Sequence, residues 1–243
     1  MKTILHVIDT TGPGGAETVF VNIADRMRTR GYRSIALIRG EGWVYEELKR
    51  KEVETHILDC KGSFNVGFLR KLVSLIKKEN VTIIQSHLLG SNIYCAMAGL
   101  ISGRRVYATF HGGVDVSSTE RFLRLKGFIL NAGVSKFIAV STSLRNEIKQ
   151  AGLLNEDKTV VIQNGIDLSL YQKSPHTQIK QHLGLASSDV IIGSLGNVRP
   201  AKAYEVLVRA AAKAIEKAPR LHFVIGGDVS STKLMQKLNL LCS

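Results

Sequence analysis

Short runs of apolar residues alternate with longer amphipathic stretches along most of this chain. The runs are rich in β-branched residues, as in Val81-Thr82-Ile83-Ile84, which is typical of parallel strands buried on both faces. The stretches between them repeat apolar residues at three- and four-residue spacing, as amphipathic helices do. This alternation predicts βαβ units, and therefore an α/β fold with a parallel sheet.

The predicted elements of residues 1–168 form one complete Rossmann-like domain. The predicted strands are Thr3–Ile8, Ser34–Ile38, Glu54–Leu58, Thr82–Gln85, Arg105–Thr109, Lys136–Val140 and Thr159–Ile162. The predicted helices are Glu17–Arg30, Val44–Lys51, Val66–Glu79, Ser91–Ile101, Ser118–Ala132 and Ser141–Ala151.

A second alternating pattern follows a polar stretch, so we predict a linker over residues 169–188 and a second domain over 189–243. The predicted elements of this domain are two strands and two helices, Asp189–Leu195, Ala203–Lys217, Leu221–Ile225 and Thr232–Leu240. Two strands with two helices bury little surface and leave sheet edges open. We therefore expect residues 189–243 to be the first two βα units of an incomplete Rossmann-like domain.

Composition narrows the class of protein. A hydrophobic content of 44% and a charged content of 22% are ordinary for a globular protein. The cysteines (Cys60, Cys95, Cys242) lack disulfide-like or metal-like spacing, which favours a reducing compartment. There is no signal-peptide pattern and no apolar run long enough to span a membrane. We predict a cytoplasmic protein, with peripheral attachment at the inner face of the membrane left open.

The net charge of +13 points to anionic partners. Lys and Arg are dispersed over predicted helices, and no nucleic-acid-binding motif is present, so we predict no nucleic acid partner. One segment alternates basic and apolar residues in a way that fits an acidic membrane surface: Arg121, Phe122, Leu123, Arg124, Leu125, Lys126 and Phe128. An ordinary helix with a basic exposed face explains this segment as well.

A glycine-rich turn, residues 12–15, joins the first predicted strand to the first predicted helix. Free backbone amides and the helix dipole at such a place suit a phosphate or a sugar hydroxyl, which glycines such as Gly14 and Gly15 allow to come close. The third glycine of a dinucleotide fingerprint is replaced by Glu17. We therefore expect no nicotinamide or flavin cofactor, and a tight turn without a ligand remains an alternative.

Two histidines follow successive predicted strands at the edge where open α/β sheets bind ligands. His87 follows Thr82–Gln85, and His111 follows Arg105–Thr109 and precedes Gly112. An imidazole at this edge can donate or accept a hydrogen bond or carry a proton near neutral pH. Their equivalent positions favour a functional role over a structural one.

Two later loops are further candidates. Asn164-Gly165-Ile166-Asp167 follows the last strand of the first domain, where it forms a turn or a hinge between domains. Gly196–Lys202 leads from a strand into a helix and carries Arg199 and Lys202, which together suit a diphosphate. Two solvated basic residues at a turn are the plainer alternative for the second loop.

The order of these motifs resembles the retaining glycosyltransferases of family 4, which have a GT-B fold. The motifs are Gly14-Gly15-Ala16-Glu17, His87, His111-Gly112, Val140-Ser141, Asn164-Gly165-Ile166-Asp167 and Gly196–Lys202. The resemblance implies two Rossmann-like domains that face each other across a cleft. It implies that the amino-terminal domain holds the acceptor and the carboxy-terminal domain the nucleotide-sugar donor.

The resemblance also implies roles for individual residues, with side chains rather than a metal or cofactor supplying the electrostatics. His111 would be catalytic, beside the transferred sugar. The expected donor-binding residues are Gly14, Gly15, Gly196, Arg199 and Lys202. The expected acceptor-side residues are Glu17, His87 and Asn92, and the expected hinge residues are Asn164, Gly165 and Asp167.

The chain departs from the family pattern at its end, because the second domain lacks a Glu-x7-Glu motif and a final helix crossing back to the first domain. We therefore expect a chain truncated within its donor domain, and turnover by this chain alone is left open. The predicted function is a hexosyltransferase-type enzyme of cell-envelope polysaccharide synthesis, moving a sugar from a nucleotide sugar to a glycan or lipid-linked acceptor with retention. A non-catalytic glycan-binding remnant and a GT-B-fold sugar-nucleotide epimerase remain alternatives.

Overall fold

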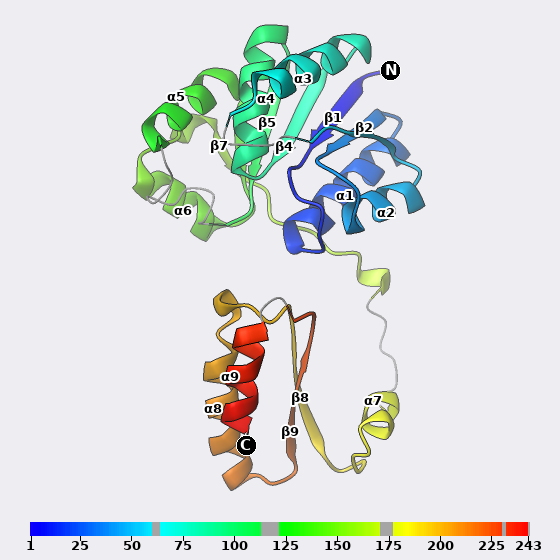
Figure 1. The fold of residues 1–243 in the computed structure, drawn as a ribbon, viewed down its shortest axis with the longest axis vertical. Coiled ribbons are helices and arrows are strands. Elements are labelled where there is room, and N and C mark those ends of the chain that lie inside the picture. The colour runs from blue at the N-terminus through cyan, green and yellow to red at the C-terminus, as the bar shows by residue number, and fades with distance from the viewer. Residues whose placement is uncertain (60–63, 113–121, 171–176, 230–231, 243) are drawn as a thin grey trace. The chain divides into compact units, whose positions relative to one another are not determined.

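The chain forms two compact units in a computed structural model that describes residues 1–59, 64–112, 122–170, 177–229 and 232–242. Unit 1 is Met1–Ile166 and unit 2 is Asp167–Ser243 (Figure 1). The division between them lies close to residue 168, where we predict the first domain to end.

Unit 1 is built on a seven-stranded parallel sheet with the order β3-β2-β1-β4-β5-β6-β7. Its strands are β1 (Thr3–Val7), β2 (Arg33–Ile38), β3 (Glu54–Ile57), β4 (Ile83–His87), β5 (Arg105–Phe110), β6 (Lys136–Ala139) and β7 (Thr159–Val161). Every residue of β1 is buried, which explains its continuous apolar run. The predicted α/β class is confirmed, and each strand lies within two residues of its predicted bounds.

Within the described part of unit 1, six helices join these strands and cover both faces of the sheet (Figure 1). They are α1 (Gly15–Thr29), α2 (Trp43–Arg50), α3 (Val66–Lys78), α4 (Leu89–Ser102), α5 (Leu123–Gly133) and α6 (Thr142–Ala151). Helices α1 and α2 share one core with Ala36 and Ile38 of β2. Helices α3 to α6 share the other core with Ile35 and Leu37 of β2. Alternate residues of one strand therefore enter opposite cores, as the pleat requires.

Helices α4 and α5 approach each other at glycines. A Cβ atom added to Gly133 would lie 2.3 Å from the backbone oxygen of Ala96, and one added to Gly99 would meet the side chain of Val106. Close packing of α4 holds its first turn over the carboxyl ends of β4 and β5. This fixes the position of the site described below.

Helix α5 is shorter than the pattern predicts, since it begins at Leu123 and not at Ser118. Residues 118–121, including Arg121, lie outside the described residues. Three apolar side chains of this region are exposed: Phe122, Leu125 and Phe128. No helix within the described ranges combines the length and the hydropathy needed to cross a membrane.

Unit 2 contains two parallel strands, β8 (Val190–Leu195) and β9 (Leu221–Gly226), with helices α8 (Tyr204–Lys217) and α9 (Thr232–Cys242). Val198, Tyr204, Leu234 and Leu238 form its small core. Most residues of β8 are exposed, in contrast to the buried strand β1. The two predicted strand–helix pairs are therefore present, and they bury only a small apolar core.

A short helix, α7 (Thr177–His182), occurs where we predict only a linker. Gly184, with a φ of 68°, follows the helix, and the amide of Leu185 donates to the carbonyl oxygen of Lys180 at 2.8 Å. A left-handed glycine just after a helix is a common stop. Gly184 was thus a local indication of this helix, obscured by the polar composition around it.

Candidate functional site

The two histidines predicted at the ligand-binding edge of the sheet lie in contact. His87 is the last residue of β4, and His111 directly follows β5, the neighbouring strand. Nδ1 of His87 and Nε2 of His111 are 2.9 Å apart. The ring centroids are 5.1 Å apart with an interplanar angle of 21°, so the rings are also stacked. Two histidines 24 positions apart in the chain therefore form one contacting pair.

Burial differs between the two rings. His87 is fully buried, whereas His111 is partly exposed. Burial lowers the pKa of His87 well below its ordinary value, and repulsion from His111 and His6 lowers it further. His87 is therefore a neutral ring behind a more accessible one, and the partly exposed His111 is the ring that a substrate can reach.

His6 is a buried histidine that we did not single out from the sequence. It lies in β1 with no exposed surface, and burial lowers its pKa to about 4. The ring of Phe20 stands edge-on to both His6 and His87, with centroid distances of 6.4 and 5.4 Å. A polar residue within the apolar run Ile4–Ile8 was the available sequence indication.

Asn92 ties the ends of β4 and β5 together. Its side chain is fully buried, Oδ1 accepts from the hydroxyl of Ser86 at 2.6 Å, and Nδ2 donates to the carbonyl oxygen of Thr109 at 3.2 Å. Its described contacts are thus internal to the protein. They position the strand ends that carry His87 and His111, and the acceptor-side role of Asn92 stays a prediction.

The chain turns sharply between His87 and α4. Leu88, the residue before the helix, has a φ of 71° and a ψ of 155°, a conformation that residues with a side chain rarely adopt. Its amide donates to the carbonyl oxygen of Thr109, and its own carbonyl oxygen accepts from the amide of Asn92. Backbone strain of this kind concentrates at functional sites. The two backbone hydrogen bonds of Leu88 keep the turn in this conformation, and the turn in turn positions the ring of His87.

The glycine turn begins α1 without a side-chain cap among the described residues. Gly14 is the N-cap in an extended conformation, and Gly15 is the first helical residue. The carboxylate of Glu17 lies against Gly14, while a Cβ added to Gly15 would meet nothing within 4 Å. The space at Gly15 leaves room for a ligand near the first turn, and the donor-binding role of Gly14 and Gly15 stays a prediction.

The basic loop of unit 2 lies between β8 and α8. Arg199 and Lys202 are exposed, and within the described residues neither is in an ion pair. The Lys202 side chain passes over Gly196, whose φ is 157°, and the Tyr204 hydroxyl donates to the carbonyl oxygen of Gly196 at 2.9 Å. Two exposed cations on one loop are suited to a diphosphate, and the donor-binding role of Arg199 and Lys202 stays a prediction.

The predicted hinge residues lie at the division between the units. Asn164, Gly165 and Asp167 are all exposed, and the division falls between Ile166 and Asp167. Oδ1 of Asp167 accepts from the amide and the hydroxyl of Ser169. Little packing restrains this segment, and its role as a hinge stays a prediction.

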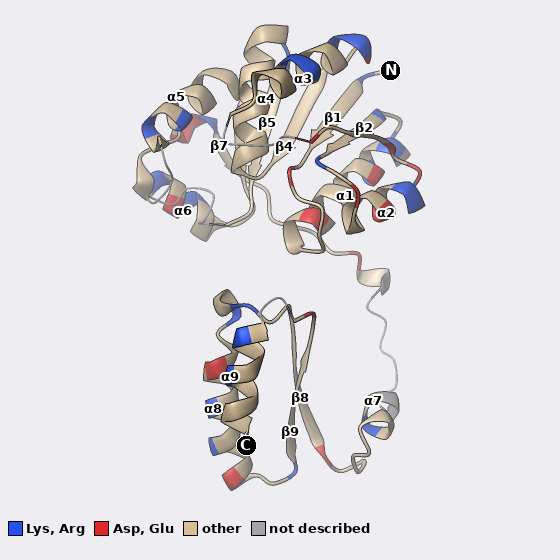
Figure 2. Cartoon of the chain, in the orientation of Figure 1, with Lys and Arg blue, Asp and Glu red and all other residues tan. Residues whose placement is uncertain are grey.

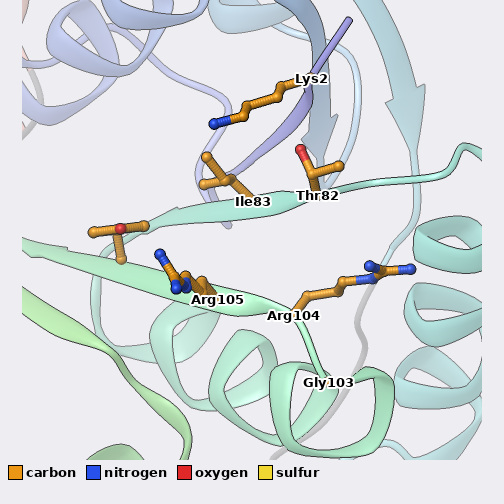
Figure 3. A pocket seen from close by; sticks show the side chains of 7 residues that line it. Lys2, Thr82, Ile83, Gly103, Arg104 and Arg105 are labelled. Atoms are coloured by element: carbon orange, nitrogen blue, oxygen red, sulfur yellow. The ribbon is translucent and has the colours of Figure 1, made fainter.

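A shallow hollow of about 270 Å³ lies at the opposite edge of the sheet, before the starts of β1, β4 and β5 (Figure 3). It is lined by Lys2, Thr82, Ile83, Gly103, Arg104, Arg105 and Tyr107. Figure 2 shows further Lys and Arg residues spread over several helices, as the sequence predicts. Among the described residues, no group of three or more His, Cys, Asp or Glu side chains could hold a metal ion.

Comparison with known families identifies the chain. The profile of Glycosyltransferase Family 4 matches residues 13–170, which include Gly14 and Gly15, both contacting histidines and the predicted hinge. The chain belongs to glycosyltransferase family 4. The basic loop with Arg199 and Lys202 lies outside the segment that the family profile matches.

Individual relatives of this family 4 chain cover it almost completely. N-acetyl-alpha-D-glucosaminyl L-malate synthase of Bacillus anthracis is 26% identical over 97% of the chain. The crystal structure of Anabaena HepE in complex with UDP-glucose has a TM-score of 0.84 at 22% identity and covers 99% of the chain. A glycosyltransferase of Rickettsia africae ESF-5 has a TM-score of 0.82 at 22% identity over 99% of the chain.

The family 4 chain is shorter than these relatives. It spans 64% of the Bacillus anthracis synthase, 65% of HepE and 64% of the Rickettsia protein. The solved structures share its fold, and the GT-B type predicted from the motifs is confirmed.

Proposed function

We propose that this chain acts in the transfer of a sugar from a nucleotide sugar to a glycan or lipid-linked acceptor, with retention at the anomeric carbon. Membership of glycosyltransferase family 4 supports the transfer, and the complexes of HepE with UDP-glucose and UDP support a uridine nucleotide. The observation that carries the proposal is the contact between His87 and His111 at the ligand-binding edge of the sheet. A hexose is the transferred sugar in this proposal.

In the proposed reaction, the bond between the anomeric carbon and the diphosphate oxygen breaks and the nucleoside diphosphate leaves. Retention requires the acceptor oxygen to form its bond on the face that the diphosphate leaves. The leaving phosphate oxygen is then the nearest base for the acceptor hydroxyl proton. Arg199 and Lys202 stabilise the negative charge that develops on the diphosphate. His111 hydrogen-bonds beside the sugar, where positive charge develops, and no metal or cofactor takes part.

Charge reversal in the basic loop tests donor binding. We expect Arg199→Glu with Lys202→Glu to weaken UDP-glucose binding at least 100-fold, since two charge-assisted contacts of about 1.5–3 kcal/mol each are lost. Lys213→Glu with Lys217→Glu is the matched control, because these exposed residues of α8 carry the same charge away from the loop. Calorimetric titration measures both variants. Equal affinity in the two double variants would contradict the role of the loop.

Product analysis tests the reaction itself. Incubation with UDP-glucose and a panel of glycan and lipid-linked acceptors is expected to release UDP and give a product with the anomeric configuration of the donor. An isomerised nucleotide sugar without acceptor would identify an epimerase. Glycan binding without donor binding would identify a non-catalytic remnant.

Helix α5 supports a peripheral membrane contact near a lipid-linked acceptor. The exposed Phe122, Leu125 and Phe128 lie beside the exposed Arg124, which combines apolar insertion with attraction to anionic lipid. We expect the chain to sediment with phosphatidylglycerol vesicles at low salt and not with phosphatidylcholine vesicles. Equal retention on both, or none on either, would remove this part of the proposal.

A further inference from the structure

The contact between His87 and His111 requires one hydrogen between two ring nitrogens. Nδ1 of His87 and Nε2 of His111 are 2.9 Å apart, and either nitrogen can supply the hydrogen. In one arrangement, His87 Nδ1–H donates to Nε2 of His111. In the other, His111 Nε2–H donates to Nδ1 of His87. The two arrangements differ in what remains at Nε2 of His87.

Nε2 of His87 decides between these arrangements. It is buried, and no described residue offers it a hydrogen-bond partner. A neutral histidine has one N–H, so the first arrangement leaves a lone pair at Nε2 of His87 and the second leaves an N–H there. A buried N–H without an acceptor is rarer in folded proteins than an unsatisfied acceptor. The first arrangement is therefore favoured.

The surroundings keep His87 from becoming doubly protonated. Burial and repulsion from His111 and His6 lower its pKa well below the ordinary value. Within the described residues, His6 of β1 and His111, directly after β5, are the charged neighbours that lower this pKa. On the side of helix α1, His87 meets the uncharged ring of Phe20. On the side of α4, the carboxylate of Asp9 lies against Gly90 in the first turn of the helix.

We propose that His87 is a positioning residue that sets the tautomer of His111. His87 donates from Nδ1 to Nε2 of His111, so His111 is neutral and has its hydrogen on Nδ1. If His111 were protonated at Nε2, its N–H would point at the N–H on Nδ1 of His87. His87 could avoid this only by moving its hydrogen to its own buried Nε2. The strained turn at Leu88 and the burial of His87 keep the donating ring in place.

A neutral His111 matters for the chemistry proposed above, and only this consequence rests on the proposed function. As the donor bond breaks, positive charge develops on the sugar. A cationic imidazolium beside it would oppose that charge, whereas a neutral ring does not. His87 thereby acts on the reaction through His111 without touching the sugar.

Long-range proton–nitrogen NMR of the nitrogen-15-labelled chain tests the tautomer directly, without activity. His111→Gln assigns the His111 signals. We expect the wild-type chain to show the Nδ1–H pattern for His111, and His87→Asn to retain it, since the Asn side-chain amide can donate from nearly the same place. His87→Leu is expected to lose the pattern, and His111 then takes up a proton at a higher pH.

His6→Leu is the matched control, because His6 is buried to the same extent and its described ring contact is with Phe20 and not with His111. We expect it to leave the His111 pattern unchanged. An Nε2–H or doubly protonated His111 in the wild-type chain at pH 7 overturns the proposal, as does an unchanged pattern in His87→Leu. The wild-type result decides even if His87→Leu does not fold.

The pH profile of kcat separates this inference from the proposed function. With UDP-glucose as donor, we expect His87→Leu to lose kcat by roughly tenfold as the pH is lowered from 7 to 5, with little change in donor KM. The wild-type chain and His87→Asn keep kcat over that range. Absence of transfer in every variant would refute the proposed function and leave the NMR result standing. Transfer with the opposite tautomer would refute the inference alone.

Discussion

At the scale of single residues, Gly15 is a glycine that ligand binding explains better than packing does. Nothing lies within 4 Å of a Cβ placed at this first residue of α1, so the protein itself does not require glycine there. The family motif and the open amides of the first turn offer another reason for the glycine, which is the close approach of a ligand.

We expect Gly15→Ala to leave the free energy of unfolding unchanged or slightly raised, because alanine favours helix, and to weaken UDP-glucose binding about tenfold or more through a clash with the ligand. Urea denaturation and calorimetric titration measure the two quantities. Gly193→Ala is the control, since that position in β8 is also open. A Gly15→Ala chain with wild-type affinity would show that no ligand comes close to this turn.

His6 makes the stability of unit 1 depend on pH. Its pKa is about 4 in the folded chain and about 6.5 when unfolded. Between these values the unfolded chain binds more protons, so stability falls as the pH is lowered from 7 to 5. His6 accounts for about 2 kcal/mol of this loss, and His87, whose pKa is also lowered, adds to it.

Urea denaturation at both pH values, followed by the fluorescence of Trp43 in α2, measures this loss. Trp43 is the single tryptophan of the chain, so its signal reports unit 1. His6→Leu is expected to show a loss smaller by about 2 kcal/mol. The same loss in both chains would show that His6 is not held neutral by burial.

At the scale of elements, the bounds of helices and strands follow from local patterns, and the exceptions have local causes. The helix α7 was missed because polar residues dominate its sequence, although Gly184 marked its end. The close packing of α4 against α5 was not predictable, because a glycine in a helical pattern does not show which other helix packs against it. Gly133 admits the backbone of Ala96.

Gly133→Ala is therefore expected to destabilise unit 1 by about 1–3 kcal/mol through overpacking, and to disturb α4 and the strand ends it holds. Urea denaturation followed by Trp43 fluorescence measures the change. The helical glycine Gly15, which has open space, provides the contrast, because its substitution by alanine is expected to cost nothing. Equal stability of the two variants would show that α5 moves aside without cost.

At the scale of the whole molecule, the two units differ in how much of their sheet is buried. Every residue of β1 is buried, whereas four of six residues in β8 are exposed, including Leu195 at 89%. A two-stranded sheet has little independent stability. The units are therefore expected to open separately, unit 2 at lower free energy.

Native-state hydrogen exchange read by mass spectrometry tests this difference. We expect peptides from β8 and β9 to exchange at least 100-fold faster than peptides from β1 and β4, because opening unit 2 exposes less apolar surface and costs less. Equal protection of the two sheets would mean that the units unfold together.

From the sequence alone we predict the α/β class, nearly all element bounds and the placement of His87 and His111 at strand ends. These depend on residue periodicity and turn chemistry, which are local. The folded chain shows in addition that β4 lies beside β5 and that Asn92 binds both strand ends. It also shows that one histidine ring is buried behind the other, 2.9 Å away. Such distances depend on sheet order and register, which no local pattern contains.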